Sequence, residues 1–180
     1  HTVRHTEILA TKETAKLFEH RYGKAKFNIL EYNRPKRLKG VKVELFPSGH
    51  ILGGAQILIE RGGTKMVYTG DFKLRKSLTA KKAEIKRCDI LIMESTFGLP
   101  QYIFPHPREI QVQMVEFVEE AQARGKIPVF LAYSLGKAQE AMKILSNRGY
   151  KLSVHKTIYN IAKIYEEFGV KFKKYEHYSC

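Results

Sequence analysis

The chain has 180 residues and a formal net charge of +14, from 32 Lys and Arg against 18 Asp and Glu. Hydrophobic residues make up 43% of it, which is ordinary for a globular protein that buries a core. No apolar run approaches the roughly 18 residues of a membrane span, and two cysteines are too few for a disulfide framework. We therefore expect a protein of a reducing, cytoplasmic compartment with no membrane partner.

The first half of the chain is predicted to be rich in β-strands. Thr11 is a typical N-cap for a helix that runs to about Tyr22, and Gly23 follows as a stop signal. Hydrophobic runs then predict five strands, at residues 27–32, 41–46, 56–60, 66–68 and 89–93. Gly62-Gly63, between the third and fourth of these strands, is typical of a hairpin turn.

The second half alternates strands with helices. Amphipathic spacing predicts helices at residues 107–124, 135–148 and 157–168, and short apolar runs predict strands at residues 128–133, 151–154 and 170–172. A β-α-β-α-β order of this kind implies a parallel sheet. The pattern changes near Gly98, which indicates that a second domain begins there.

Two residues in the first half could bind a metal ion. His50 lies in a glycine-rich turn after the predicted strand 41–46, and Asp71 follows the predicted strand 66–68. Loops at strand ends often carry ligands, and zinc accepts both imidazole and carboxylate. The residue types alone also fit a histidine in a turn and a capping aspartate, so the alternative of a purely structural pair stays open.

The sequence pattern around these two residues resembles a known pair of metal-binding motifs. Residues 49–55 read G-H-x-x-G-x-A, and residues 69–72 read T-G-D-F after the next strand. This combination is similar to the third and fourth metal motifs of the metallo-β-lactamase superfamily. Further along, residues 88–98 resemble the strand and acidic motif A of the β-CASP nucleases.

The later segments narrow the resemblance within that family. They read F-G-L-P at residues 97–100, A-Y-S-L-G-K-A-Q at residues 132–139 and V-H at residues 154–155. In this order they are similar to the DNA ligase-associated exonucleases of bacteria and archaea. These are relatives of the Artemis group of DNA-repair nucleases and of mRNA 3′-end processing factors. The resemblance covers essentially the whole chain.

The resemblance implies a fold and an activity. We expect an α/β protein with a partial metallo-β-lactamase domain, a mixed sheet with helices, over residues 1–98. A partial β-CASP domain with a β-α-β-α-β parallel sheet would follow over residues 99–180. The implied activity is that of a metal-dependent exonuclease that hydrolyses DNA or RNA with a hydroxide activated by two zinc ions. DNA ligase or other repair machinery are the implied partners.

The family pattern also assigns roles in the metal site. By resemblance, His50 is a ligand of one ion, Asp71 bridges both ions, and His1 is a ligand of the second ion. Glu94, at the end of a continuously apolar strand, pairs in the family with a histidine that protonates the leaving oxygen. His155 is the candidate partner, because a histidine beside a carboxylate suits a general acid. An ordinary histidine at a helix start is the alternative for His155.

A phosphate-binding segment is expected at the start of the predicted helix 135–148. Ser134 and Lys137 flank the turn that leads from a strand into this helix. Backbone N–H groups at a helix start, a hydroxyl and a lysine together make an anion site. The functional interpretation is a grip on a substrate phosphate, and the alternative is a plain helix cap with an exposed lysine.

The resemblance further shows what these 180 residues lack. The family's H-x-H-x-D-H motif, of which His1 would be the last histidine, is not in the sequence, and neither is the family's late metal-binding histidine. We therefore expect an internal segment of a longer enzyme, which is inactive alone and holds zinc only weakly.

Two other classes of function stay open. The net charge and the basic clusters at residues 34–39, 73–87 and 171–174 favour a nucleic-acid partner. The missing H-x-H-x-D part supports a module that binds nucleic acid without cleaving it. A lysine-rich soluble surface would show the same charge. The third class is a small-molecule hydrolase of the same superfamily, such as a thioesterase. The α/β segment after Glu94 argues against it, because simple hydrolases lack that insertion.

Overall fold

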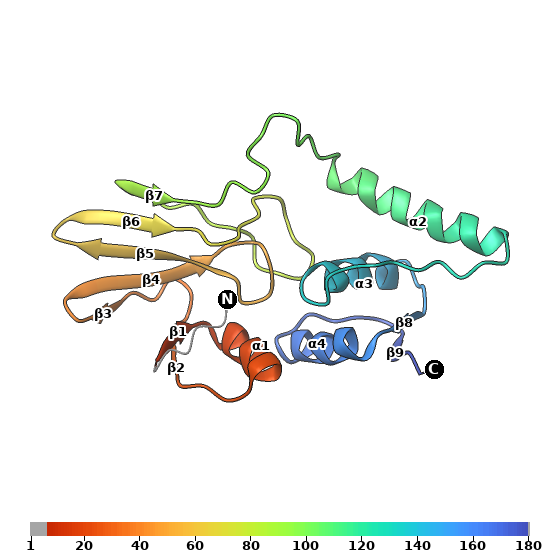
Figure 1. The fold of residues 1–180 in the computed structure, drawn as a ribbon, viewed down its shortest axis with the longest axis horizontal. Helices are drawn as coiled ribbons and strands as arrows, with labels where there is room; N and C mark the ends of the chain where they lie inside the picture. The colour runs from red at the N-terminus through yellow and green to blue at the C-terminus, as the bar shows by residue number, and fades with distance from the viewer. Residues whose placement is uncertain (1–6, 180) are drawn as a thin grey trace. The chain divides into compact units, whose positions relative to one another are not determined.

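The computed structural model describes residues 7–179, and these residues form two compact units (Figure 1). The first unit runs to Glu94 and takes in residues 167–169, and the second holds residues 95–166 and those from 170 onward. The fold is mixed α/β, with a mixed sheet and helices, as the sequence predicts.

The first unit contains a five-stranded sheet and a smaller pair of strands. The sheet has the order β3-β4-β5-β6-β7, with bounds Lys36–Leu38, Val41–Pro47, Ala55–Arg61, Thr64–Tyr68 and Ile90–Ile92. Neighbours are antiparallel from β3 to β6, and β7 joins β6 in parallel. The parallel pair β1 and β2 is connected by helix α1, with bounds Ile8–Ala10, Phe27–Ile29 and Lys12–Tyr22.

Strand β4 carries core side chains on both of its faces. Val43 and Leu45 pack with Leu30 in one cluster of buried residues. Phe46, which is completely buried, packs with Leu58 in a second cluster. Because successive residues of a strand point to opposite faces, these clusters lie on the two sides of the sheet, and the end of β4 is therefore firmly held.

Local sequence signals place the first helix and the hairpin correctly. The side chain of Thr11 accepts a hydrogen bond from the Thr14 backbone N–H, and α1 ends at Gly23. The turn between β5 and β6 has φ of +56° at Gly62 and +84° at Gly63. Two successive positive φ angles are what a tight hairpin turn requires, and only glycine adopts them without strain. Both predictions are confirmed.

Strand β7 is the edge of the five-stranded sheet. Its side chains, Ile90, Leu91 and Ile92, are all apolar and are between 46% and 55% exposed. Among residues 7–179, no strand pairs with its outer edge. The predicted strand at residues 89–93 therefore exists, but half of its apolar surface meets solvent.

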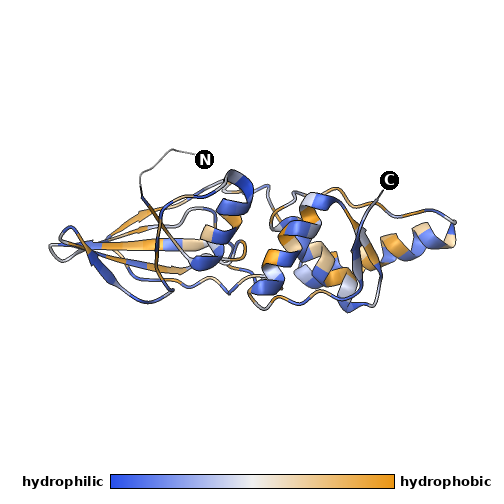
Figure 2. Ribbon diagram, turned by 90° about the horizontal axis from the view of Figure 1, so that it is seen from below, coloured by the Kyte–Doolittle hydropathy of each residue, from blue (hydrophilic) through white to orange (hydrophobic). Residues whose placement is uncertain are grey.

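The second unit consists of three helices and one pair of strands. The helices are α2, α3 and α4, with bounds Pro107–Ala123, Lys137–Asn147 and Lys156–Glu167. Strands β8 and β9 pair in parallel around α4, with bounds Leu152–Val154 and Tyr175–His177. The helices alternate hydrophobic and hydrophilic surface along their length (Figure 2). Of the helices described, none combines the length and the apolar character needed to cross a lipid bilayer.

The strand predicted at residues 128–133 is wrong. The segment has no ladder partner in the described part of the chain and forms no regular structure. Ile127, Val129 and Leu131 are 88%, 67% and 96% exposed. A strand needs a partner as well as a β-prone sequence, and hydrophobic patterning reports only the second condition.

The strand predicted at residues 170–172 is also wrong. The strand that pairs with β8 lies a few residues later, at Tyr175–His177. Phe172 is instead buried as a core side chain near Tyr165, with ring centroids 6.5 Å apart. Lys174 adopts a positive φ of 45° just before the pairing begins. The apolar run thus marks the core contact, and the turn at Lys174 sets the start of the strand.

Candidate active site

The loop that joins β4 to β5 positions His50. Ser48 donates its backbone N–H to the Gly54 carbonyl at 3.0 Å, and Gly54 donates its N–H to the Ile51 carbonyl at 3.0 Å. Ser48 is almost completely buried. Gly49 has a φ of +75°, so the backbone turns sharply just before His50. These bonds close the loop at its base and leave His50 exposed at its tip.

The start of helix α1 holds the far side of the same loop. The hydroxyls of Thr11 and Thr14 both donate to the Gly53 carbonyl, at 2.9 and 2.8 Å. A Cβ atom on Gly53 would lie 2.6 Å from the Cβ of Glu13, so only glycine fits here. The sequence shows Thr11 as a helix cap but does not show this second role of the two threonines.

Tyr32 gives the loop a third support. Its hydroxyl donates to the Gly54 carbonyl at 2.9 Å. Burial of the phenol, and then the negative charge of Glu13, raise the pKa of Tyr32 above its ordinary value. The hydroxyl therefore keeps its proton and its hydrogen bond across the physiological range.

His50 and Asp71 lie together at one end of the sheet. The distance from His50 Nε2 to Asp71 Oδ2 is 3.8 Å, and their side chains are 43% and 75% exposed. Asp71 follows β6, and His50 follows β4, so adjacent loops of one unit supply both groups. A mutual approach of this kind, open to solvent on one side, is suited to binding a cation.

The distance between the two side chains fits a shared zinc ion. Zinc binds imidazole nitrogen and carboxylate oxygen at roughly 2.0–2.2 Å, and 3.8 Å lies within the sum of two such bonds. Within residues 7–179 there is no group of three or more metal-binding side chains. His1, the other expected ligand, lies outside the described residues. The described part of the chain thus offers two donors.

Glu94 reaches the loop that carries Asp71. Its Oε1 accepts a hydrogen bond at 2.9 Å from the backbone N–H of Phe72, the residue after Asp71. The Glu94 N–H donates to the Thr69 hydroxyl at 3.4 Å. The carboxylate is therefore partly buried beside the candidate metal site and is held by backbone contacts.

His155 begins helix α4 in the second unit. Its Nδ1 accepts a hydrogen bond from the Thr157 backbone N–H at 3.2 Å. His106 does the same at the start of α2, where its Nδ1 accepts from the Arg108 N–H, also at 3.2 Å. Because Nδ1 accepts this bond in each residue, Nε2 is the ring nitrogen that could face another group. The pairing of His155 with Glu94 stays a prediction.

The segment around Ser134 and Lys137 is organised by a buried glutamine. Gln139, completely buried, accepts the Gly136 N–H through Oε1 at 2.7 Å and donates Nε2–H to the Ser134 carbonyl at 3.0 Å. The Ala138 N–H donates to the Tyr133 carbonyl at 3.1 Å. Two N–H groups at this helix start therefore serve internal bonds.

The side chain of Lys137, the positive charge expected to bind phosphate in this segment, lies near an aromatic ring. The Lys137 ammonium lies 5.0 Å from the centroid of the Tyr133 ring, which is a cation–π distance. Helix α3 begins at Lys137 rather than at Leu135 as predicted, because Gly136, with a φ of +86°, interrupts the helical backbone. An anion at this helix start would meet the ammonium and the hydroxyl of Ser134 more than backbone N–H groups.

Two glutamines have structural roles that the motifs alone do not reveal. Gln139 shapes the turn before α3, and Gln56 donates Nε2–H to the Pro47 carbonyl at 2.9 Å and the Glu84 carbonyl at 2.8 Å. Both stand at apolar positions of a strand or helix. A buried amide needs hydrogen-bond partners. A glutamine at an otherwise apolar position of the sequence is therefore the signal that could have predicted these two roles.

The similarity of the chain to known proteins extends over its whole length. It is 35% identical over 181 residues to a probable DNA ligase from Opitutus terrae, which covers 99% of this chain and 18% of that protein. It is 32% identical over 118 residues to an RNase J-like protein from Methanocaldococcus jannaschii, which covers 64% of this chain and 28% of that protein.

A eukaryotic RNA-processing factor shows a comparable similarity. The chain is 37% identical over 123 residues to cleavage and polyadenylation specificity factor subunit 3 from Dictyostelium discoideum, covering 67% of this chain and 16% of that protein. No protein-family model matches the chain. The chain spans less than a third of the length of each of these relatives. It belongs to the β-CASP family of the metallo-β-lactamase superfamily.

Proposed function

We propose that the protein is a zinc-dependent nuclease that hydrolyses phosphodiester bonds of DNA or RNA. The observation that supports this most directly is the approach of His50 to Asp71 at 3.8 Å, with the Glu94 carboxylate bonded to the next residue, Phe72. The names of the relatives, an RNase J-like protein and a probable DNA ligase among them, agree with a nucleic-acid substrate. The two units would be partial metallo-β-lactamase and β-CASP domains.

The metal would be held by His50 and by Asp71, which would bridge two zinc ions in the full-length protein, with His1 as a further ligand. When bound, zinc lowers the pKa of water and neutralises charge on the scissile phosphate. Asp71 carries the negative charge that retains a divalent cation, and the loop bonds from Thr11 and Thr14 fix the position of His50. Preorganised ligands avoid the cost of reorganising the site when a cation binds.

A test of this function uses metal removal. The full-length protein should hydrolyse a labelled oligonucleotide, lose activity after dialysis against a chelator, and regain it when zinc is added back. Hydrolysis that continues unchanged after chelation would exclude metal-dependent nuclease action. Binding of the oligonucleotide without any hydrolysis would favour the alternative of a non-catalytic nucleic-acid module.

Glu94 and His155 would together protonate the leaving oxygen, with His155 as the general acid and Glu94 as its partner. The Nδ1 atom of His155 is occupied by the Thr157 N–H, so a proton for the leaving oxygen would come from Nε2. A carboxylate beside the ring would favour the charged imidazolium, which carries a proton on both nitrogens, so Nδ1 would give up the Thr157 N–H when the ring is charged. The proposal requires the two units to bring Glu94 and His155 within hydrogen-bond reach.

Replacing His155 with asparagine in the full-length protein is expected to lower kcat about 10²-fold or more and to flatten the pH profile. Asparagine is a good N-cap, so α4 should keep its stability. The matched control is His106→Asn, which replaces the equivalent cap of α2. Equal loss of activity in both variants, or a parallel drop in melting temperature, would show that His155 serves only as a cap.

Ser134 and Lys137 would bind a substrate phosphate, and a terminal phosphate at this position would make the enzyme an exonuclease. Lys137→Ala in the full-length protein is expected to weaken hydrolysis of 5′-phosphorylated ends about tenfold more than that of unphosphorylated ends, because a charge-assisted contact is lost. Competition assays with the two substrates measure this ratio. Equal loss on both substrates would assign Lys137 to general backbone attraction.

DNA ligase or other repair machinery is the proposed partner. The support is the similarity over 99% of the chain to a probable DNA ligase. A nuclease that trims DNA ends would supply ends suitable for joining. Co-purification of a ligase activity with the full-length protein would test this association.

A further inference from the structure

The segment after Asp71 returns to the loop that carries His50. The Lys73 N–H donates to the Ser48 carbonyl at 2.9 Å, and the Glu84 N–H donates to the Pro47 carbonyl at 3.1 Å. A Cβ atom on Gly49 would lie 2.2 Å from the Lys73 carbonyl oxygen and 2.9 Å from the Ala83 nitrogen. Residues 73–84, here called the 73–84 loop, therefore leave and rejoin the sheet beside His50.

The 73–84 loop has an ordered interior of its own. The Ser77 hydroxyl accepts hydrogen bonds from the N–H groups of Thr79, at 3.1 Å, and Ala80, at 3.0 Å. Ser77 and Thr79 are both buried. Gln56 anchors the far end through the Glu84 carbonyl. A closed loop of this length, packed by its own side chains, is an Ω-loop, a type that frequently carries function.

The loop is predominantly basic, and its one acid, Glu84, stands at its end, where the carboxylate accepts hydrogen bonds from Asn33. Five of the eleven residues 73–83 are Lys or Arg and none is Asp or Glu. Within the described residues, the ion pairs found do not include Lys73, Lys76 or Lys82. Lys81 lies 4.7 Å from the centroid of the Tyr32 ring. The loop backbone is therefore ordered by its own bonds, and among the described residues the charges of Lys73, Lys76 and Lys82 stand outside these ion pairs.

The contrast with other lysines on the same unit is clear. Lys86 pairs with Glu44 and Lys42 pairs with Glu60. Such pairs satisfy their charges internally. Lys73, Lys76 and Lys82, which stand outside these pairs, would raise the local concentration of a polyanion beside the candidate hydrolytic site.

We propose that the 73–84 loop is a phosphate track that holds the backbone of a nucleic-acid strand beside the His50–Asp71 pair, an inference that rests on the proposed nuclease function. Lys73, Lys76 and Lys82 neutralise successive phosphates and release their counterions. Because the ends of the loop are bonded at Ser48 and Pro47, the strand is aligned with the loop that carries His50. The track supplies affinity and position, and His50 and Asp71 supply the chemistry.

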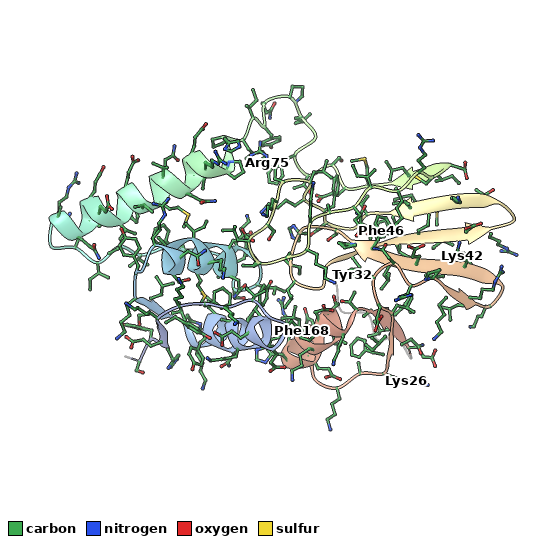
Figure 3. All side chains as sticks on the ribbon, turned by 180° about the vertical axis from the view of Figure 1, so that it is seen from behind. Lys26, Tyr32, Lys42, Phe46, Arg75 and Phe168 are labelled. Atoms are coloured by element: carbon green, nitrogen blue, oxygen red, sulfur yellow. The ribbon has the colours of Figure 1, made fainter. Side chains whose placement is uncertain are left out.

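A second basic cluster on the first unit provides a matched control. Lys36 and Arg37 lie on β3, which pairs with the start of β4, and Lys39 follows in the turn. Lys42 and Phe46 mark the two ends of β4 in Figure 3. A strand rises roughly 3.4 Å per residue, so this cluster stands about the length of β4 away from the His50 loop.

The experiment compares two triple variants of the full-length protein by binding of a fluorescent single-stranded oligonucleotide in a chelating buffer. One variant is Lys73→Gln, Lys76→Gln and Lys82→Gln, and the other is Lys36→Gln, Arg37→Gln and Lys39→Gln. Each removes three positive charges, so the net charge is equal. Circular dichroism confirms that both variants are folded, and affinity is measured between about 50 and 200 mM salt.

The loop variant is expected to bind about 10²-fold more weakly near 0.1 M salt, with a slope of log affinity against log salt that is smaller by about 2. The β3 variant is expected to lose less than about threefold. Equal losses of affinity in the two variants would show that only net charge matters. No loss of affinity in the loop variant would refute the proposed phosphate track. Because binding is measured without hydrolysis, a failure of the proposed catalytic function would show separately, as a wild-type protein that binds but does not cleave.

Discussion

Replacing Asp71 with asparagine in the full-length protein is expected to lower kcat for phosphodiester hydrolysis by roughly 10³-fold, about 4 kcal/mol of transition-state stabilisation. Asparagine keeps the size of the side chain, whose Oδ2 lies 3.8 Å from His50 Nε2, but has no charge to retain a divalent cation. Zinc content should fall in parallel. Single-turnover cleavage of a labelled oligonucleotide, together with metal analysis after dialysis, measures both quantities.

The matched control for this variant is Asp89→Asn. Asp89 is also an exposed aspartate of the first unit, but its Oδ2 accepts the Lys65 backbone N–H at 2.7 Å at the start of β7. Its loss should cost about 1 kcal/mol of stability at most and leave zinc content unchanged. If Asp71→Asn retains full activity and zinc, Asp71 is not a metal ligand and the structural alternative for this residue holds.

Replacing Gly49 with alanine is expected to destabilise the chain by about 3 kcal/mol or more. A side chain at a φ of +75° costs roughly 1–2 kcal/mol. The added Cβ would also lie 2.2 Å from the Lys73 carbonyl oxygen, and backbone must shift to relieve that overlap, at roughly 1–3 kcal/mol. The midpoint of urea unfolding, measured on the 180-residue chain, gives the change in the free energy of unfolding.

Gly62→Ala separates the two contributions. Gly62 also has a positive φ, of +56°, but a Cβ atom there would meet nothing within 4 Å. Its replacement should cost only about 1 kcal/mol, the penalty for the left-handed backbone. If the two variants were equally stable, the close packing of the 73–84 loop against Gly49 would be refuted.

The features that the sequence predicts well are those with local causes. Thr11 caps α1 through its own side chain, and Gly62-Gly63 form the hairpin turn with positive φ angles. Helix α2, predicted at residues 107–124, runs from Pro107 to Ala123. Each of these depends on a few neighbouring residues, whose preferences act alike in any fold.

The features that the sequence does not predict depend on distant partners. Residues 128–133 have the composition of a strand, yet pairing is a property of two segments, and none of the described strands pairs with this one. The role of Thr14 requires Gly53, 39 positions away. The 73–84 loop carries a visible basic cluster, but only the contacts with Ser48 and Pro47 place it beside His50.

The candidate site lies between these two cases. The sequence motifs predict that His50 and Asp71 lie in loops after strands. The antiparallel pairs β4–β5 and β5–β6 bring those loops to the same end of the sheet. The sheet order follows from short hairpin-like connections, so this proximity is accessible to sequence reasoning. The relation of Glu94 to His155 is not, because it involves two separate units.

Because the apolar strand β7 is half exposed, the tendency of the chain to aggregate is expected to depend on ionic strength. The β7 edge of Ile90, Leu91 and Ile92, which no strand of residues 7–179 pairs, is a template on which a second chain can add a strand. Such edges drive aggregation unless something opposes them. In this chain the opposing force is the mutual repulsion of molecules that each carry +14. That repulsion acts over about 10 Å at 0.1 M salt and shrinks as salt is added. Concentrated salt, which would weaken the proposed binding to nucleic acid, therefore also removes the barrier that keeps molecules of this chain apart.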